Sequence, residues 1–167
     1  MSGMENLPRV ALDWHRAGRG AALATVVETW GSAPRRTGSQ LVISGDGAIE
    51  GSVSGGCVEG AVIVEAMEAL DDGKPRLLSF GVSDGDAFAV GLACGGTIRV
   101  LVEPVGTALP EAVLAELVAA REARQAVAYV TDLESGGPHL SRAHVHRLRM
   151  DRSGVEEDGR TFVAVHN

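Results

Sequence analysis

Aromatic residues are scarce in this sequence, which has only two tryptophans, one tyrosine and three phenylalanines among its 167 residues. The hydrophobic core must therefore consist mainly of Val, Leu, Ile and Ala side chains. Proteins that bind single-stranded nucleic acid stack the bases on aromatic rings. The shortage of such rings argues against this class of protein.

Basic residues are also too few for a typical nucleic-acid-binding protein. Lysine and arginine total 15, aspartate and glutamate total 22, and the formal net charge is −7. Affinity for duplex nucleic acid comes mainly from Lys and Arg side chains that neutralise phosphates, so the sequence predicts no nucleic-acid partner. A small anionic ligand is still compatible with this charge, because backbone N–H groups bind anions without net positive charge.

Cysteines and long apolar segments are few as well. Cys57 and Cys94 are the only cysteines, too few for a disulfide scaffold or a cysteine-rich zinc site. No run approaches the roughly 18 apolar residues of a transmembrane helix, and the first residues lack the pattern of a signal peptide. We therefore expect a cytoplasmic protein without membrane association, in which both cysteines are thiols.

The hydrophobic patterns predict an α/β fold with helices packed on a mixed β-sheet. An Asp46-Gly47 turn signal predicts a hairpin, which argues against an all-parallel sheet. Beyond residue 125, alternating residues predict an edge hairpin or an additional sheet, with a turn at Gly136-Gly137. The predicted helices begin near Leu7, after Cys57 and near Pro110, and the predicted strands cover residues 21–30, 41–43, 48–53, 75–81, 97–103, 126–133, 139–150 and 160–166.

Glycine, by contrast, is abundant and unevenly placed. Of the 22 glycines, eight lie in residues 31–60 and five in residues 81–96. Each of these two stretches also contains one of the two cysteines, directly beside a pair of glycines. The two motifs are Gly55-Gly56-Cys57 and Cys94-Gly95-Gly96.

The first of these motifs has the order strand, glycine turn, helix. Glycines let backbone N–H groups approach a ligand closely, and a helix N-terminus offers unpaired N–H donors and partial positive charge. Together they predict a phosphate site, in which Cys57 should hold more thiolate than an ordinary cysteine. The alternative is a small buried cysteine in a tight turn, but two such motifs in one chain favour a functional site. The motif is neither a P-loop nor a Rossmann fingerprint.

Other polar residues are weaker candidates. Arg35 could hold a phosphate or carboxylate, or be a solvated loop charge. Ser54 could donate its hydroxyl or only shape a turn. Glu59 is favoured near a helix start by the helix dipole alone. His144 and His146 have no evident third ligand, so the sequence predicts no metal site.

Three longer blocks of the sequence resemble the motifs of the XdhC/CoxI family, the xanthine dehydrogenase accessory factors. The resemblance covers about residues 5–105, in the family's order and spacing. The blocks are Glu28-Thr-Trp-Gly-Ser-Ala-Pro-Arg-Arg-Thr-Gly38, Gly51-Ser-Val-Ser-Gly-Gly-Cys-Val-Glu-Gly60, and Phe80-Gly-Val-Ser-Asp with Val90-Gly-Leu-Ala-Cys-Gly-Gly-Thr-Ile-Arg-Val-Leu-Val-Glu-Pro104.

The resemblance implies a chaperone that binds the molybdenum cofactor, molybdopterin, as cargo. Such a protein shields the cofactor while a cysteine desulfurase supplies its sulfido ligand, and then hands it to an apo molybdenum hydroxylase such as xanthine dehydrogenase or carbon monoxide dehydrogenase. Family members are often homodimers. Cys57 and Cys94 match the motif cysteines and Arg35 matches the Pro-Arg of the first block. The resulting cofactor-binding prediction comprises Arg35, Ser54, Gly55, Gly56, Cys57, Cys94, Gly95 and Gly96, with no catalytic residue.

Longer family members carry a Rossmann-like domain after this module. Here residues 106–167 have no dinucleotide fingerprint, and we expect them to form a helix and strands that extend the same compact unit as residues 1–105. The Rossmann-like half is then either a separate partner protein or dispensable. Two alternatives to the chaperone stay open: a thiol-dependent sulfur or redox transferase that uses Cys57 and Cys94, and a pure protein-interaction module.

Overall fold

The structure, a computed structural model, describes most of the first two thirds of the chain and parts of the last third. Predicted features in the remaining segments, such as the loop at 82–96, lie outside the described residues. The described residues are 7–30, 38–53, 59–81, 97–125, 127–132, 136–141, 154–155 and 161–166.

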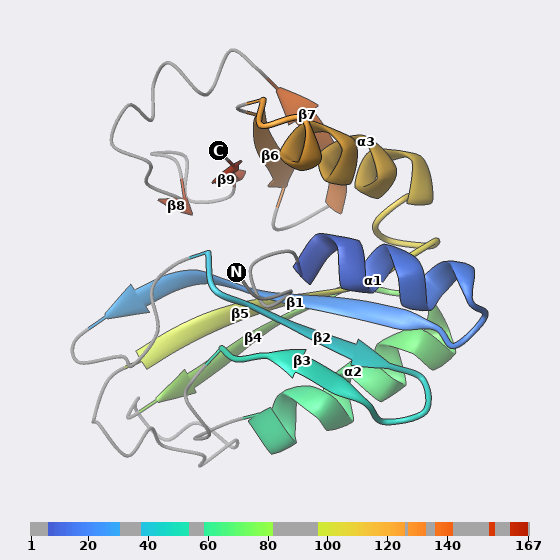
Figure 1. The fold of residues 1–167 in the computed structure, drawn as a ribbon. Coiled ribbons are helices and arrows are strands. Elements are labelled where there is room, and N and C mark those ends of the chain that lie inside the picture. Colours follow the sequence, from blue (N-terminus) through green and yellow to red (C-terminus); the bar gives the residue numbers. More distant parts are fainter. Residues whose placement is uncertain are drawn as a thin grey trace.

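A five-stranded sheet forms the centre of the protein (Figure 1). Its strand order is β3-β2-β1-β5-β4, and every neighbouring pair is antiparallel. The α/β class is confirmed, but this sheet is antiparallel throughout rather than mixed. The reason is that helix α2 connects β3 to β4, two strands of the same direction that lie at opposite edges and never pair. The strands are β1 (Ala21–Trp30), β2 (Gln40–Ser44), β3 (Ile49–Gly51), β4 (Arg76–Gly81) and β5 (Thr97–Pro104).

Helices pack on both faces of this sheet. Helix α1 (Leu7–Arg16) lies on one face, with α3 (Glu111–Glu122) packed beyond it, and α2 (Glu59–Asp72) lies on the other face (Figure 1). All three helices begin close to where the sequence predicts them. Gly73 ends α2, since its φ is +73° and its N–H donates to the Ala69 carbonyl over 2.7 Å.

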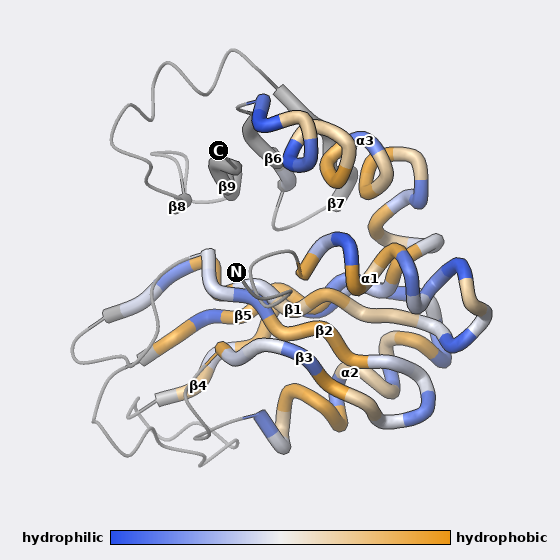
Figure 2. The backbone as a smooth tube through the Cα atoms, in the orientation of Figure 1, coloured by the Kyte–Doolittle hydropathy of each residue, from blue (hydrophilic) through white to orange (hydrophobic). Residues whose placement is uncertain are grey.

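The two faces of the sheet contribute to separate hydrophobic cores. Residues of β1 alternate between them: Leu23 and Val27 face α1, whereas Ala24 and Val26 face α2. Figure 2 shows hydrophobic residues along β2, β5 and α2. Both faces of the central strand are therefore buried over residues 21–27, which explains why these residues are apolar apart from Thr25.

A second sheet follows α3 in the chain, so the prediction of an additional sheet is confirmed. Its order is β7-β6-β9-β8. The predicted turn at Gly136-Gly137 is wrong, because Gly136 pairs with Asp132 and begins β7. That residues 106–167 extend the same compact unit as residues 1–105 stays a prediction. The strands are β6 (Val127–Asp132), β7 (Gly136–Ser141), β8 (Gly154–Val155) and β9 (Thr161–His166).

An ion-pair cluster joins α2 to the start of β4. The guanidinium of Arg76 lies 2.6 Å from an Asp72 carboxylate oxygen, 3.3 Å from Glu65 and 4.0 Å from Glu68. Hydrogen bonds from the Arg76 guanidinium and from the Lys74 N–H lower the pKa of Asp72 to about 2. The charged form of Asp72 is therefore favoured in the folded state.

This cluster predicts a stability difference that depends on pH. The pKa of Asp72 lies below the unfolded value of about 3.9, so its contribution is present above that value and is lost as the pH falls through about 2. Arg76→Gln should lower the free energy of unfolding at pH 6, and the difference from wild type should shrink between pH 4 and pH 2. Urea unfolding at four pH values measures it, with Arg124→Gln as a control at an exposed position. An equal difference at pH 6 and pH 2 would contradict the assignment.

Candidate functional site

The last residues of β1, β3 and β4 and the first residues of β2 and β5 lie on the same side of the central sheet. We call this side the loop end. Trp30 and Gly81, the last residues of β1 and β4, both lie opposite Thr97, the first residue of β5. β2 begins and β3 ends on the same side of the sheet but further back along β1, with Gln40 opposite Thr25 and Gly51 opposite Leu41. The chain leaves or enters the sheet five times at the loop end.

None of the predicted cofactor-binding residues belongs to the described part of the chain. They fall in the three segments 31–37, 54–58 and 82–96, and the residues on both sides of each segment lie at the loop end. The topology thus brings together the flanks of every segment that carries a predicted site residue. The positions of the site residues themselves stay a prediction. They are Arg35, Ser54, Gly55, Gly56, Cys57, Cys94, Gly95 and Gly96.

The segment 31–37 begins and ends on neighbouring strands. Beyond it, the Gly38 N–H donates to the Val26 carbonyl over 2.7 Å, and the Val26 N–H donates to the Ser39 carbonyl over 2.9 Å. These two bonds extend the ladder between β1 and β2 past Gln40. Both flanks of the segment that contains Arg35 are therefore fixed by main-chain hydrogen bonds.

The segment 54–58 is bracketed by Glu59, the first residue of α2. Oε2 of Glu59 accepts a hydrogen bond from the Ser52 hydroxyl at 2.7 Å and another from the Val53 N–H at 3.0 Å. Val53 is fully buried, so its N–H needs such an acceptor. From the sequence, the helix dipole alone explains an acidic residue at the start of α2. The hydrogen bonds show that Glu59 has a further structural role. Glu59 also joins the two flanks of the segment that contains Cys57.

Removing the Glu59 carboxylate should lower stability. Glu59→Ala leaves the Val53 N–H without this acceptor, and we expect a loss of about 1–3 kcal/mol in the free energy of unfolding. Glu59→Gln keeps an acceptor oxygen and should lose clearly less. Urea unfolding of both variants measures this, with the exposed Asp71→Ala on the same helix as control. Equal losses for Ala and Gln at position 59 would show that the acceptor is not what matters.

A charged pair that sequence reasoning missed also lies at the loop end. Arg99 of β5 and Glu28 of β1 are direct cross-strand partners and form an ion pair, each about one quarter exposed. A register shift between Val26 and Glu28 turns Glu28 to the same face as Arg99. On this face, which also carries α1, the Gln40 amide donates to the Thr25 hydroxyl over 3.3 Å. Polar groups thus replace the hydrophobic core of this face as it approaches the loop end.

Two negative observations concern only the described part of the chain. Within it, no three His, Cys, Asp or Glu side chains are grouped so that they could hold a metal ion. Within the same residues, the helices are too short or too polar to cross a membrane. The predicted pair His144 and His146 lies outside the described residues.

Comparison with known proteins identifies the module that carries the loop end. The model of the XdhC and CoxI family matches residues 14–81. Residues 14–81 form an XdhC/CoxI module. The resemblance seen in the sequence is thereby confirmed, and the matched range includes the first two motif blocks with Arg35 and Cys57, while Cys94 follows it.

Curated relatives match over about half of this chain or more. The chain is 39% identical over 102 residues to the molybdenum cofactor insertion chaperone PaoD of Escherichia coli, which is 61% of this chain and 32% of PaoD. It is 32% identical over 87 residues to a probable xanthine dehydrogenase subunit of Bacillus subtilis, 51% of this chain and 26% of that protein. The chain thus matches a third or less of the length of these relatives.

A solved structure shares the fold of the whole chain. A xanthine dehydrogenase from Bacillus halodurans superposes with a TM-score of 0.72, and the match covers 100% of this chain and 53% of that one. Sequence identity is 24%, so this likeness concerns the fold alone.

Proposed function

We propose that this protein is an accessory protein that binds the molybdenum cofactor as cargo and inserts it into a molybdenum hydroxylase. The observation that carries the proposal is the XdhC/CoxI module together with 39% identity to a molybdenum cofactor insertion chaperone over 61% of this chain. PaoD is named as an insertion chaperone, which supports a carrier without turnover of its own.

We propose the loop end of the central sheet as the cofactor site. The cofactor contains a pterin, a phosphate and a dithiolene-bound metal. Backbone N–H groups of Gly55 and Gly56, ahead of the start of α2, suit the phosphate, and Arg35 supplies a charged fork. A thiolate of Cys57 or Cys94 is a soft group suited to the metal or its sulfur. Ser54, Gly95 and Gly96 complete the predicted lining. With so few aromatic residues, the pterin would be held mainly by backbone and small polar groups.

We also propose the partners that this role requires. An apo molybdenum hydroxylase receives the cofactor, and a cysteine desulfurase supplies the sulfur of its sulfido ligand while the cofactor is bound here. The carrier is proposed to work in the cytoplasm as a homodimer, and a separate Rossmann-domain protein is proposed as a further partner. The longer relatives leave room for such a domain, since this chain matches 32% of PaoD.

Transfer of cofactor to an apoenzyme tests the function. The protein, loaded with molybdenum cofactor, is mixed with an apo xanthine dehydrogenase, and recovery of xanthine oxidation is followed over time. We expect faster recovery than with the same amount of free cofactor, and a further increase when a cysteine desulfurase and cysteine are present during loading. Recovery no faster than with free cofactor would refute the chaperone role.

A thiol titration separates the carrier from the thiol-dependent transferase. The carrier needs no bond between its two cysteines, so mild oxidation of the free protein should leave both thiols titratable. Loss of both thiols on oxidation, restored by a reductant, would instead favour a redox or sulfur transferase that uses Cys57 and Cys94 as a pair.

A further inference from the structure

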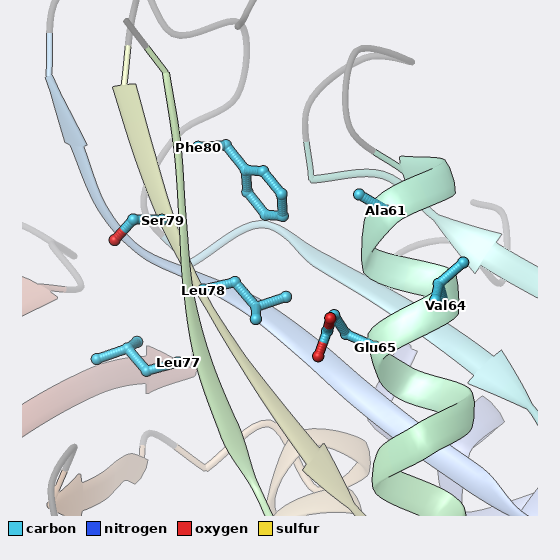
Figure 3. Close-up of a pocket in the computed structure, with 7 residues that line it drawn as sticks. All are labelled: Ala61, Val64, Glu65, Leu77, Leu78, Ser79 and Phe80. Carbon is cyan, nitrogen blue, oxygen red and sulfur yellow. The ribbon is translucent and has the colours of Figure 1, made fainter. Parts of the chain in front are cut away.

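An apolar cleft lies between α2 and the edge strand β4, and its lining contains none of the predicted cofactor-binding residues. Its volume is about 430 Å³, and it is lined by Ala61, Val64 and Glu65 of α2 and by residues 77–80 of β4. Figure 3 shows Leu78 and Phe80 pointing from the strand toward the helix, with Ala61 and Val64 on the opposite wall.

Part of the apolar surface at the cleft is accessible, although Phe80 itself is only 4% exposed. Val64 is 57% exposed, and Met67 on the same helix is 38% exposed. A fully exposed position normally carries a polar residue, and large hydrophobic side chains gathered beside a cleft are typical of an interaction surface. The cleft therefore offers both a hollow and an apolar rim.

The strand that forms one wall also has an open edge. β4 is the last strand of its sheet, and among the described residues it pairs only with β5. Its outer edge consequently presents main-chain N–H and C=O groups that another strand can use. Alternate side chains of an added strand would then face the cleft.

The charge at one end of the cleft selects the kind of partner. Three carboxylates, of Glu65, Glu68 and Asp72, lie around the guanidinium of Arg76, and Lys74 is a second cation near Asp72. The excess of negative charge attracts a basic partner, because opposite charges across an interface favour association. The net charge of −7 acts in the same direction.

We propose that this cleft binds an extended segment of a partner protein, which adds to β4 as a strand, places apolar side chains against Val64 and Phe80, and carries Lys or Arg toward the acidic cluster around Arg76. This surface stands independently of the proposed cofactor site, because none of its residues lies in the three segments that carry the predicted cofactor ligands.

A designed peptide provides the probe. A dye-labelled peptide with the sequence Val-Thr-Val-Thr-Lys-Thr-Lys, called the Lys-Val peptide, places its Val and Lys side chains on one face of a strand. It is titrated with the full-length protein, and binding is followed by fluorescence anisotropy. Matched peptides carry Glu in place of Lys, or N-methyl groups on the valines. We expect the Lys-Val peptide to bind at least about tenfold more tightly than either control, because one control reverses the charge and the other blocks strand addition.

Protein variants distinguish docking from simple charge attraction. Val64→Asp adds a negative charge inside the cleft, whereas Ile49→Asp adds the same charge on the opposite edge strand, where Ile49 is 44% exposed. Docking predicts that Val64→Asp weakens binding of the Lys-Val peptide about tenfold and that Ile49→Asp does not weaken it. Unchanged or tighter binding by Val64→Asp overturns the proposal.

Two further outcomes would also contradict the proposal. Equal binding of the N-methylated peptide would exclude strand addition. In sedimentation velocity, a dimer of the unliganded protein that Val64→Asp dissociates and Ile49→Asp does not would show that a second copy occupies the cleft, which overturns the choice of a basic partner.

Discussion

Replacing Cys57 by alanine is expected to weaken binding of the molybdenum cofactor by about tenfold to a hundredfold, the usual effect of losing a strong charged contact at a binding site. Cys57 is the cysteine that stands in the Gly-Gly-Cys motif, two residues before α2 begins. A thiolate there is favoured by the partial positive charge of the helix N-terminus. Equilibrium binding of the purified cofactor, measured by its absorbance after rapid gel filtration, gives the two dissociation constants.

Matched variants make this result specific. Arg35→Ala should weaken binding by a similar factor, because a guanidinium fork on a phosphate is a charge-assisted contact. Arg19→Ala is the control, since Arg19 pairs with Asp46 over 2.9 Å at the other end of the sheet, and it should bind the cofactor as wild type does. If Cys57→Ala and Arg35→Ala both bind like wild type, the loop end is not the cofactor site.

Replacing Gly51 by alanine is expected to lower the free energy of unfolding by about 3 kcal/mol, from backbone strain and overpacking together. Gly51 has a φ of +92°, which side chains other than hydrogen tolerate poorly. A Cβ atom there would lie 2.4 Å from the Gln40 carbonyl oxygen and 2.8 Å from a Leu7 methyl group. The strand and α1 would both have to move. Because Gly51 ends β3 at the loop end, cofactor binding should fall with stability.

The variant Gly47→Ala separates the two causes of destabilisation, which are backbone strain and overpacking. Gly47 lies in the same hairpin with a φ of +94°, but a Cβ atom added there would meet nothing within 4 Å. We expect this variant to lose only about 1 kcal/mol, the strain alone. Thermal and urea unfolding of both variants measure the difference. Equal losses at the two positions would mean that the close approach of Gln40 to Gly51 does not contribute.

Much of the fold could be predicted because the sequence pattern is strong where elements are buried. Residues 21–27 are apolar on both faces apart from Thr25, and the predicted strand 21–30 is β1 with the same bounds. The hydrophobic pattern does not predict an element that is short or polar. β8 has only two residues, Gly154 and Val155, which is too short for any periodicity. The adjacent glycines Gly136 and Gly137 indicate a turn in the sequence, because glycine favours turns. In the structure, cross-strand pairing with Asp132 places Gly136 in β7.

The candidate site, too, can be predicted from the sequence only in part. Glycine pairs and cysteines are visible in the sequence as motifs, but the cross-strand pairing that aligns their flanks at one edge depends on strand order, which no local pattern contains. Glu28 and Arg99 illustrate this, since their pairing requires β1 to lie beside β5 and a register shift to turn Glu28. The available signal in the sequence is a charged residue inside each of two largely apolar strands, Glu28 in β1 and Arg99 in β5.

Native mass spectrometry of the intact protein, purified from a host that makes the molybdenum cofactor, tests the cofactor-carrier role most directly. We expect a population of the chain with one molybdopterin mass bound, reduced in the Cys57→Ala variant and retained in Arg19→Ala. Finding only the free chain, while a molybdenum enzyme from the same cells is fully loaded with cofactor, would contradict the proposed role.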